Sequence, residues 1–302
     1  MQNWPEYILK NNELELCLVP DIGGRLMDVR YKGASLLFKN PDLLSCLPDL
    51  SRLNELPSRA KHLSFPLWGG EKTWIAPDAD WPDGAPHATL DSGKYALEKH
   101  LNNAVTLTSE ICSKSNLQIC RHITLSNSSQ WTIRHQVINK GTMSKRVGLW
   151  SVMMTLSPAN YLFRISNGHT PTTVFGNPGG AFSCDGDIGQ ITCDARREFK
   201  VGVHPPAEIT VARIPSIQGV VWIINKGLVA KHAAKYAHGH ALEFYNSGHY
   251  DYGELEWHSP MVLLPPEQSY EFELRYQIME EDENCSVAEM FNSIEQQSWS
   301  TE

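Results

Sequence analysis

The sequence predicts an all-β protein, built as a large antiparallel β-sandwich, from three observations. Apolar residues recur with a period of two in many short runs, for example over residues 13–19. Turn-forming clusters separate these runs, as at residues 139–141 and 225–227. The runs follow one another at near-regular spacing, which is typical of a sandwich or barrel. Because no Pro/Ser-rich linker interrupts the pattern, we expect a single domain over residues 1–302.

The strand-like runs cover most of the chain. They lie at residues 13–19, 25–31, 104–111, 117–125, 130–138, 147–155, 190–193, 199–203, 208–213, 220–224, 241–245, 253–257 and 270–278. Residues 41–53 carry leucines at roughly helical spacing, broken by Pro48, which predicts a short surface helix or two turns. Ser286 is suited to cap a C-terminal helix over about residues 286–297, with one apolar stripe toward the sheet.

Composition excludes several classes of partner. The chain has 302 residues, of which 41% are hydrophobic, and a formal net charge of -8. Its basic residues form no run in the sequence, so we expect no nucleic-acid partner. No apolar stretch approaches the ~20 residues of a membrane helix, so we expect no membrane partner. The seven cysteines are scattered without a C-x-x-C pair, which favours reduced thiols and a cytoplasmic protein. Phosphate-binding and dinucleotide fingerprints are absent from the sequence, so no cofactor is expected.

Residues 65–91 form the most informative segment, because they combine aromatic rings with charges. Glycines and prolines, such as Gly69-Gly70 and Pro77, predict a surface loop rather than a central strand. Flat rings beside carboxylates and a lysine suit a sugar, whose faces are apolar and whose rim is polar. The alternative is that the tryptophans plug the end of a β core. The candidate binding residues of this segment are Trp68, Glu71, Lys72, Trp74, Trp81 and Asp91.

Two further sites carry candidate polar groups. Arg25 follows the Gly23-Gly24 bend and offers paired donors to a carboxylate, a phosphate or sugar hydroxyls; the alternative is an ion pair that holds the hairpin. Glu254 and Glu256 share one face of a strand, either as solvated side chains or as a general base in a cleft. His238 and His240 resemble a metal pair, but a third ligand with firm spacing is not evident, so we expect no metal.

At three segments the chain resembles the galactose mutarotase-like, or aldose 1-epimerase-like, superfamily, and within it the DUF4380 branch. The likeness spans roughly residues 10–278. The first segment is Pro20-Asp-Ile-Gly-Gly-Arg-Leu, and the second is the tryptophan-rich run from Leu67 to Pro77 with Trp81-Pro82. The third is Glu254-Leu-Glu-Trp-His-Ser-Pro followed by Leu264-Pro-Pro-Glu.

The resemblance implies a β-sandwich that binds a sugar and interconverts its anomers. In mutarotases a glutamate on the late strand takes the proton of the anomeric hydroxyl, and a histidine protonates the ring oxygen. By position, Glu256 best fits the base and Glu254 is the second choice. The chain departs from the family at both histidines, where Trp68 and Trp150 stand, and a tryptophan nitrogen cannot titrate. Lys72, His62 or His87 are the candidates to replace the acid.

Three functions therefore compete. The first is a 1-epimerase acting on a small or oligomeric carbohydrate, with Glu256 as base and Lys72 or a nearby histidine as acid. The second is a carbohydrate-binding protein without catalysis, since both family histidines are replaced. The third is a lyase or epimerase on an acidic sugar, in which Glu256 or Tyr252 takes a proton and Arg25 and Lys72 neutralise the carboxylate.

Overall fold

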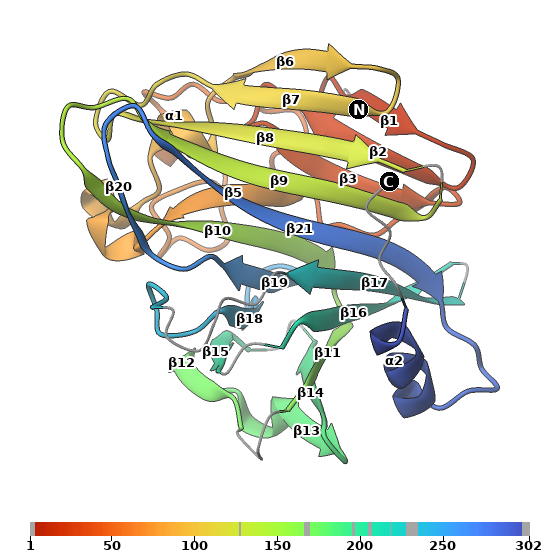
Figure 1. Ribbon diagram of the computed structural model, residues 1–302. Helices are drawn as coiled ribbons and strands as arrows, with labels where there is room; N and C mark the ends of the chain where they lie inside the picture. The colour runs from red at the N-terminus through yellow and green to blue at the C-terminus, as the bar shows by residue number, and fades with distance from the viewer. Residues whose placement is uncertain are drawn as a thin grey trace.

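The computed structural model describes residues 4–126, 128–165, 170–194, 197–204, 207–217, 219–227 and 235–297 (Figure 1). The predicted all-β sandwich is confirmed, because nearly all its regular structure is antiparallel strand in two large sheets. Among the described residues, eleven strands form the first sheet. In spatial order they are β1 (Tyr7–Lys10), β2 (Leu14–Val19), β3 (Arg25–Tyr31), β5 (Glu71–Ala76), β10 (Lys145–Leu156), β19 (Tyr252–His258), β18 (Leu242–Asn246), β15 (Phe199–Val203) and β12 (Thr172–Gly176), with β4 (Ala34–Ser35) beside β3 and β20 (Val262–Leu264) beside β10.

The second sheet has ten strands among the described residues and packs against the first. In order they are β13 (Phe182–Asp185), β14 (Ile188–Cys193), β11 (Ala159–Arg164), β16 (Ile209–Ser216), β17 (Gly219–Gly227), β21 (Ser269–Glu280), β9 (Gln130–Asn139), β8 (Leu117–Leu125), β7 (Ala104–Ser109) and β6 (Tyr95–His100). The main core lies between the sheets and holds side chains of both, such as Leu149 and Phe244 from the first and Ile133 and Tyr276 from the second.

The C-terminal helix is confirmed as α2 (Val287–Glu295). Ser286 caps it, accepting from the backbone N–H of Glu289 while the Glu289 carboxylate accepts from the Ser286 N–H. Its apolar stripe packs on side chains of β11, β16 and β17, including Trp222. Figure 1 shows α2 beside these strands. None of the helices among the described residues is long and apolar enough to cross a membrane.

Residues 41–45 and 50–51 form two turns, which is the alternative to a helix, and a 3-10 helix follows at Leu53–Glu55. Pro48 interrupts the helical leucine spacing, and Asn40 instead satisfies the backbone locally by accepting from the N–H of Asp42 at 3.0 Å. The remaining short helices are α1 (Ala88–Asp91) and the 3-10 helices Asp78–Asp80, Pro82–Gly84 and Gly179–Ala181.

The aromatic segment contradicts the expectation of a continuous surface loop. Its middle is β5, which lies between β3 and β10 inside the first sheet. Gly69 and Gly70 adopt φ of 107° and 70°, and a Cβ on Gly69 would lie 2.2 Å from the carbonyl oxygen of Phe38. The glycines therefore let the chain pass close to its neighbours and enter the sheet, whereas Pro77 follows the last strand residue, where it costs no ladder hydrogen bond.

Candidate functional site

The face of the first sheet that points away from the second sheet brings Lys72, Val152 and Glu256 into one row. Lys72 on β5 is the register partner of Val152 on β10, and Val152 is the partner of Glu256 on β19. Neighbouring strands lie about 4.8 Å apart, so the two outer Cα atoms of this row are separated by roughly 10 Å. The short side chain of Val152 therefore lies between an amine and a carboxylate.

Glu256 is fully buried, and its two carboxylate oxygens have different surroundings. Oε2 accepts hydrogen bonds from Trp150 Nε1 at 2.9 Å and from Lys200 Nζ at 2.8 Å. Oε1 is buried and has no hydrogen-bond partner among the described residues. Because a buried polar atom normally has a partner, Oε1 has hydrogen-bonding capacity that no described donor uses.

Glu254 lies two residues earlier on the same strand face and pairs with Lys72. Their Oε1 and Nζ atoms are 3.6 Å apart, and the same Nζ lies 4.0 Å from the centroid of the Trp74 ring. Burial raises the pKa of Glu254 to about 7, and the neighbouring charge of Glu256 adds to that rise. Burial also lowers the pKa of Lys72, against the attraction of Glu254. Both groups thus exchange protons more readily near neutral pH than a solvent-exposed glutamate or lysine does.

Further charged side chains, on β18 and β15, extend the row beyond Glu256. Glu243 on β18 is the register partner of Glu256, and Lys200 Nζ lies 3.3 Å from Glu243 Oε2. His258 Nε2 lies 3.3 Å from Glu243 Oε2, and His238 Nδ1 lies 3.2 Å from the same carboxylate. His240 Nδ1 lies 3.5 Å from Glu243 Oε1. Burial opposes the charge of Glu243, but these three histidines and Lys200 outweigh burial and lower the pKa of Glu243.

His238 is held between two carboxylates, since its Nε2 also lies 3.1 Å from Asp78 Oδ1. Although burial opposes it, hydrogen bonding to Asp78 and Glu243 raises the pKa of His238 to about 9. Buried His258 behaves oppositely, because desolvation lowers its pKa. Sequence reasoning missed Lys200, Glu243 and His258, although a charged residue inside an apolar strand run is a usable signal in each of the first two cases.

Four of the predicted aromatic residues line this face. The Trp81 ring stacks on Trp150 with centroids 5.7 Å apart and an interplanar angle of 18°. Trp74 meets both rings edge to face, at 5.0 Å from Trp81 and 4.9 Å from Trp150. Tyr252 stacks on Phe38 at 4.7 Å, in the same apolar cluster. Trp81 is half-buried and the other three are buried, so the rings form a wall beside the row of charges.

Trp68 and Glu71 lie in other compartments. Trp68 is fully buried in a separate cluster with Trp4 and donates its Nε1–H to Ser92 Oγ at 3.0 Å, as the plug alternative expects. Glu71 points between the sheets, where it pairs with Arg121 and accepts from Ser151 Oγ at 2.9 Å. Because side chains alternate along β5, Glu71 faces the core when Lys72 faces the outer surface.

Arg25 and Asp91 lie behind the sheet face that carries Lys72 and Glu256, and not on that face. They form a buried ion pair at 2.7 Å, which is the ion-pair alternative for Arg25. Asp91 Oδ1 also accepts from Trp74 Nε1 at 2.6 Å, so the pair holds the Trp74 ring in place. Gly23 permits this arrangement, since a Cβ there would lie 1.9 Å from the carbonyl oxygen of Asp91.

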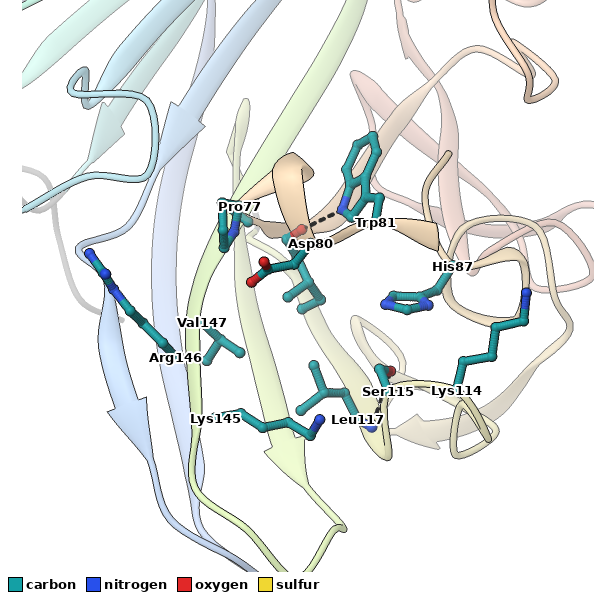
Figure 2. Close-up of a pocket in the computed structure, with 12 residues that line it drawn as sticks. Pro77, Asp80, Trp81, His87, Lys114, Ser115, Leu117, Lys145, Arg146 and Val147 are labelled. Atoms are coloured by element: carbon teal, nitrogen blue, oxygen red, sulfur yellow. Dashed lines mark hydrogen bonds between the residues drawn. The ribbon is translucent and has the colours of Figure 1, made fainter. Parts of the chain in front are cut away.

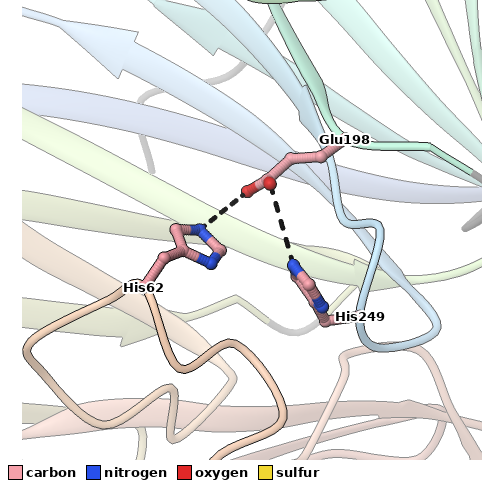
Figure 3. Close-up of side chains that lie close together, drawn as sticks. All are labelled: His62, Glu198 and His249. Carbon is pink, nitrogen blue, oxygen red and sulfur yellow. Dashed lines mark ion pairs between the residues drawn. The ribbon is translucent and has the colours of Figure 1, made fainter.

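The candidate acids His87 and His62 lie away from the row. His87 lines a pocket of about 250 Å³ at the ends of β5 and β10. Figure 2 shows Lys145 and Arg146 on one side of this pocket and Lys114 on the other, below the loop that carries Trp81. His62 lies close to Glu198 and His249 (Figure 3). Lys72 is therefore the only one of the three candidate acids in the row with Glu256 among the described residues.

Comparison with known proteins rests on structure. No protein-family model and no curated protein sequence matches the chain. A galactose mutarotase-like protein from Lactobacillus casei matches with a TM-score of 0.59 and 10% identity, over 91% of this chain and 100% of that one. The chain has the galactose mutarotase-like fold.

Two further solved structures agree with this fold. A galactose mutarotase related enzyme from Lactobacillus acidophilus has a TM-score of 0.58 at 9% identity, over 94% of this chain and 100% of that one. A proposed aldose 1-epimerase from Escherichia coli K12 has a TM-score of 0.56 at 13% identity, over 92% and 99%. The galactose mutarotase-like resemblance is thus confirmed as a fold, and the DUF4380 branch stays a prediction.

Proposed function

We propose that the protein is an aldose 1-epimerase-like isomerase, with Glu256 as the general base and Lys72 as the general acid. The observation that carries the proposal is their position in one row, on either side of the short Val152, with an oxygen on Glu256 that accepts from no donor among the described residues. A sugar ring placed over Val152 has an acceptor on one side and an ammonium donor on the other. The stacked rings of Trp81 and Trp150 offer it an apolar wall.

The proposed reaction conserves protons. Glu256 Oε1 takes the proton of the anomeric hydroxyl while the Lys72 ammonium gives one to the ring oxygen, and the bond between C1 and that oxygen breaks. The open-chain aldehyde rotates about its C1–C2 bond. Lys72 then recovers its proton from the chain hydroxyl as that oxygen attacks the other face of C1, and Glu256 returns its proton to the new anomeric oxygen. Acid and base each contribute about 10²–10⁴-fold to such a reaction.

The contacts of the Lys72 ammonium support it as the acid. Its contact with Glu254 Oε1 is 3.6 Å long, beyond a strong hydrogen bond, and its hydrogen bond to Met154 Sδ goes to a weak acceptor. The ammonium therefore keeps protons for a ligand. His238 is a poorer candidate because both of its ring nitrogens already face carboxylates.

The charges of Lys72 and Glu254 favour a second candidate function, a lyase or epimerase acting on an acidic sugar. Burial raises the pKa of Glu254, the counter-ion of Lys72, to about 7, so this carboxylate loses part of its negative charge near neutral pH. Lys72 is then incompletely neutralised, and a sugar carboxylate would complete its pairing.

Magnetisation-exchange NMR on a panel of neutral, acidic and phosphorylated sugars tests the proposal. We expect the protein to accelerate exchange between the anomeric signals of at least one sugar. Growth of ultraviolet absorbance from an unsaturated uronate would favour the acidic-sugar lyase. Binding without exchange for every sugar would contradict the isomerase and leave a carbohydrate-binding protein. If the protein neither binds nor converts any sugar of the panel, both candidate functions are rejected.

A further inference from the structure

A second cluster of ligating groups lies outside the proposed catalytic row and comes from three separate segments. His62, Glu198 and His249 each offer one ligand atom, and these atoms all lie within 4.8 Å of one another. Figure 3 shows both imidazole rings facing the Glu198 carboxylate. His62 Nε2 is 3.3 Å from Glu198 Oε1, and His249 Nε2 is 3.8 Å from Glu198 Oε2.

We propose that these three side chains bind one divalent transition-metal ion of the zinc class. Two imidazoles and one carboxylate form a borderline donor set that suits Zn²⁺. Zn²⁺ holds such ligands at about 2.0–2.2 Å, so the donors of a tetrahedral site lie roughly 3.3 Å apart. The separations of 3.3 and 3.8 Å run to the two different oxygens of Glu198, and all three ligand atoms lie within 4.8 Å of one another, so side-chain movements of about 1–1.5 Å would bring them to this spacing.

The backbone around the cluster is already organised for this role. The Arg59 N–H donates to Tyr250 Oη at 2.8 Å, which ties the segment of His62 to the loop of His249. Ser247 Oγ accepts from the His249 N–H at 3.2 Å and so braces that loop. The binding cost is therefore reduced, because the ligand-bearing segments are held close before a metal arrives.

The carboxylate has its own support. Tyr245 Oη donates to Glu198 Oε1 at 2.7 Å, an outer-shell hydrogen bond of the kind that orients metal ligands. Gly248 lets the loop approach Glu198, since a Cβ there would lie 3.1 Å from the Glu198 backbone nitrogen. Tyr245 is also the register partner of Glu254, so the metal site would adjoin the proposed catalytic face without sharing a ligand with it.

The inner group of His238, Glu243 and His258 also meets the geometric condition for a metal. There, however, Lys200 Nζ already lies 3.3 Å from Glu243 and His238 bridges Glu243 to Asp78. A lysine ammonium beside the carboxylate repels a second cation. We therefore assign the metal to the outer cluster.

Titration of the tag-free full-length chain with Zn²⁺, and with Co²⁺ followed by visible absorption, tests the site. We expect one ion per chain and a Co²⁺ spectrum of a four- or five-coordinate nitrogen and oxygen site. His62→Ala, His249→Ala and Glu198→Gln should each weaken binding at least ~10-fold. His204→Ala, which removes an exposed histidine at the end of β15, should bind like the wild type.

Circular dichroism of each variant guards against misfolding, and Zn²⁺ should raise the melting temperature of the wild type and of His204→Ala only. Two results would overturn the assignment. One is the absence of stoichiometric binding to the folded wild type. The other is binding that survives all three ligand substitutions but is lost in His258→Ala, which would move the metal to the inner group.

Discussion

The indole of Trp150 and the carboxylate of Glu256 are joined across the β10–β19 pair by a hydrogen bond of 2.9 Å to Oε2. Lys200 donates to the same oxygen, so the carboxylate is fixed through one atom while Oε1 stays without a partner among the described residues. The same indole ring stacks on Trp81. Trp150 therefore both orients the proposed base and forms the wall beside it.

Trp150→Phe should destabilise the protein by more than the loss of ring volume explains. The substitution removes a donor to a buried carboxylate, and hydrogen bonds to charged groups contribute about 1.5–3 kcal/mol. Trp131→Phe is the matched control, because Trp131 is also buried but its Nε1 has no partner in the described structure. Urea unfolding of both variants measures the difference. Equal losses would show that the Trp150 hydrogen bond contributes nothing.

Lys200→Met should be strongly destabilising, because it leaves Glu243 and Glu256 buried without their shared cation. Removing one partner of a buried ion pair costs about 3–5 kcal/mol. Adding Glu256→Gln should recover part of that loss, since the double variant buries one charge fewer. A double-mutant cycle by urea unfolding measures the coupling. Additive free energies of unfolding would mean that the two side chains do not interact.

Glu254 and His238 should each make a contribution to stability that falls as pH rises, with separate causes. Glu254 has an ordinary pKa of 4.5 that burial raises to about 7 in the folded protein. The fold therefore holds this proton more tightly than the unfolded chain, and the stabilisation is complete below pH 4.5 and is lost by about pH 7. For His238 the pKa rises from 6.5 to about 9, so its contribution is complete below pH 6.5 and is lost by about pH 9.

Unfolding free energies measured from pH 4.5 to 9 separate these two groups. Glu254→Gln should flatten the lower part of the profile, and His238→Gln should flatten the upper part. The full effect of Glu254 is at most on the order of 3 kcal/mol, since one pKa unit corresponds to about 1.4 kcal/mol. If both variants run parallel to the wild type over the whole range, the assigned pKa shifts are wrong.

Trp68 and Trp81 should respond to substitution in opposite ways. Trp68→Leu should cost about 3 kcal/mol of stability, because it opens space in a fully buried cluster, and should leave sugar affinity unchanged. Trp81→Ala should weaken sugar binding about 3–10-fold, in line with the energy of a lost aromatic contact. Isothermal titration with the sugar that exchanges best measures the sugar affinity of both variants. Loss of sugar affinity in a folded Trp68→Leu protein would contradict the placement of Trp68.

The sequence pattern predicts the strands well wherever apolar and polar residues alternate. The runs at 117–125 and 199–203 coincide with β8 and β15 to the residue. Glu254 and Glu256 share one face as expected, with Leu255 and Trp257 in the core on the other. The sequence pattern does not predict β5, because a glutamate such as Glu71 is expected at the surface. Glu71 is instead paired inside the core with Arg121 from the second sheet.

The candidate site depends on register, which local patterns do not contain. Glu243 meets Glu256 only because β18 pairs with β19, and Lys200 reaches both from one strand further. For the same reason, Trp68 and Trp74 are near neighbours in sequence but lie in different apolar clusters. Strand order and facing decide which charges meet, and both follow from pairings between distant segments.

The rate of anomer exchange in Glu256→Gln tests the central claim most directly. Glutamine keeps the size of the side chain and can still accept from Trp150, but it cannot take a proton. For the sugar that the wild type converts, we predict a fall of about 10²–10⁴-fold in catalysed exchange, with sugar binding retained. Wild-type exchange in the folded variant would contradict the assignment of Glu256 as the base.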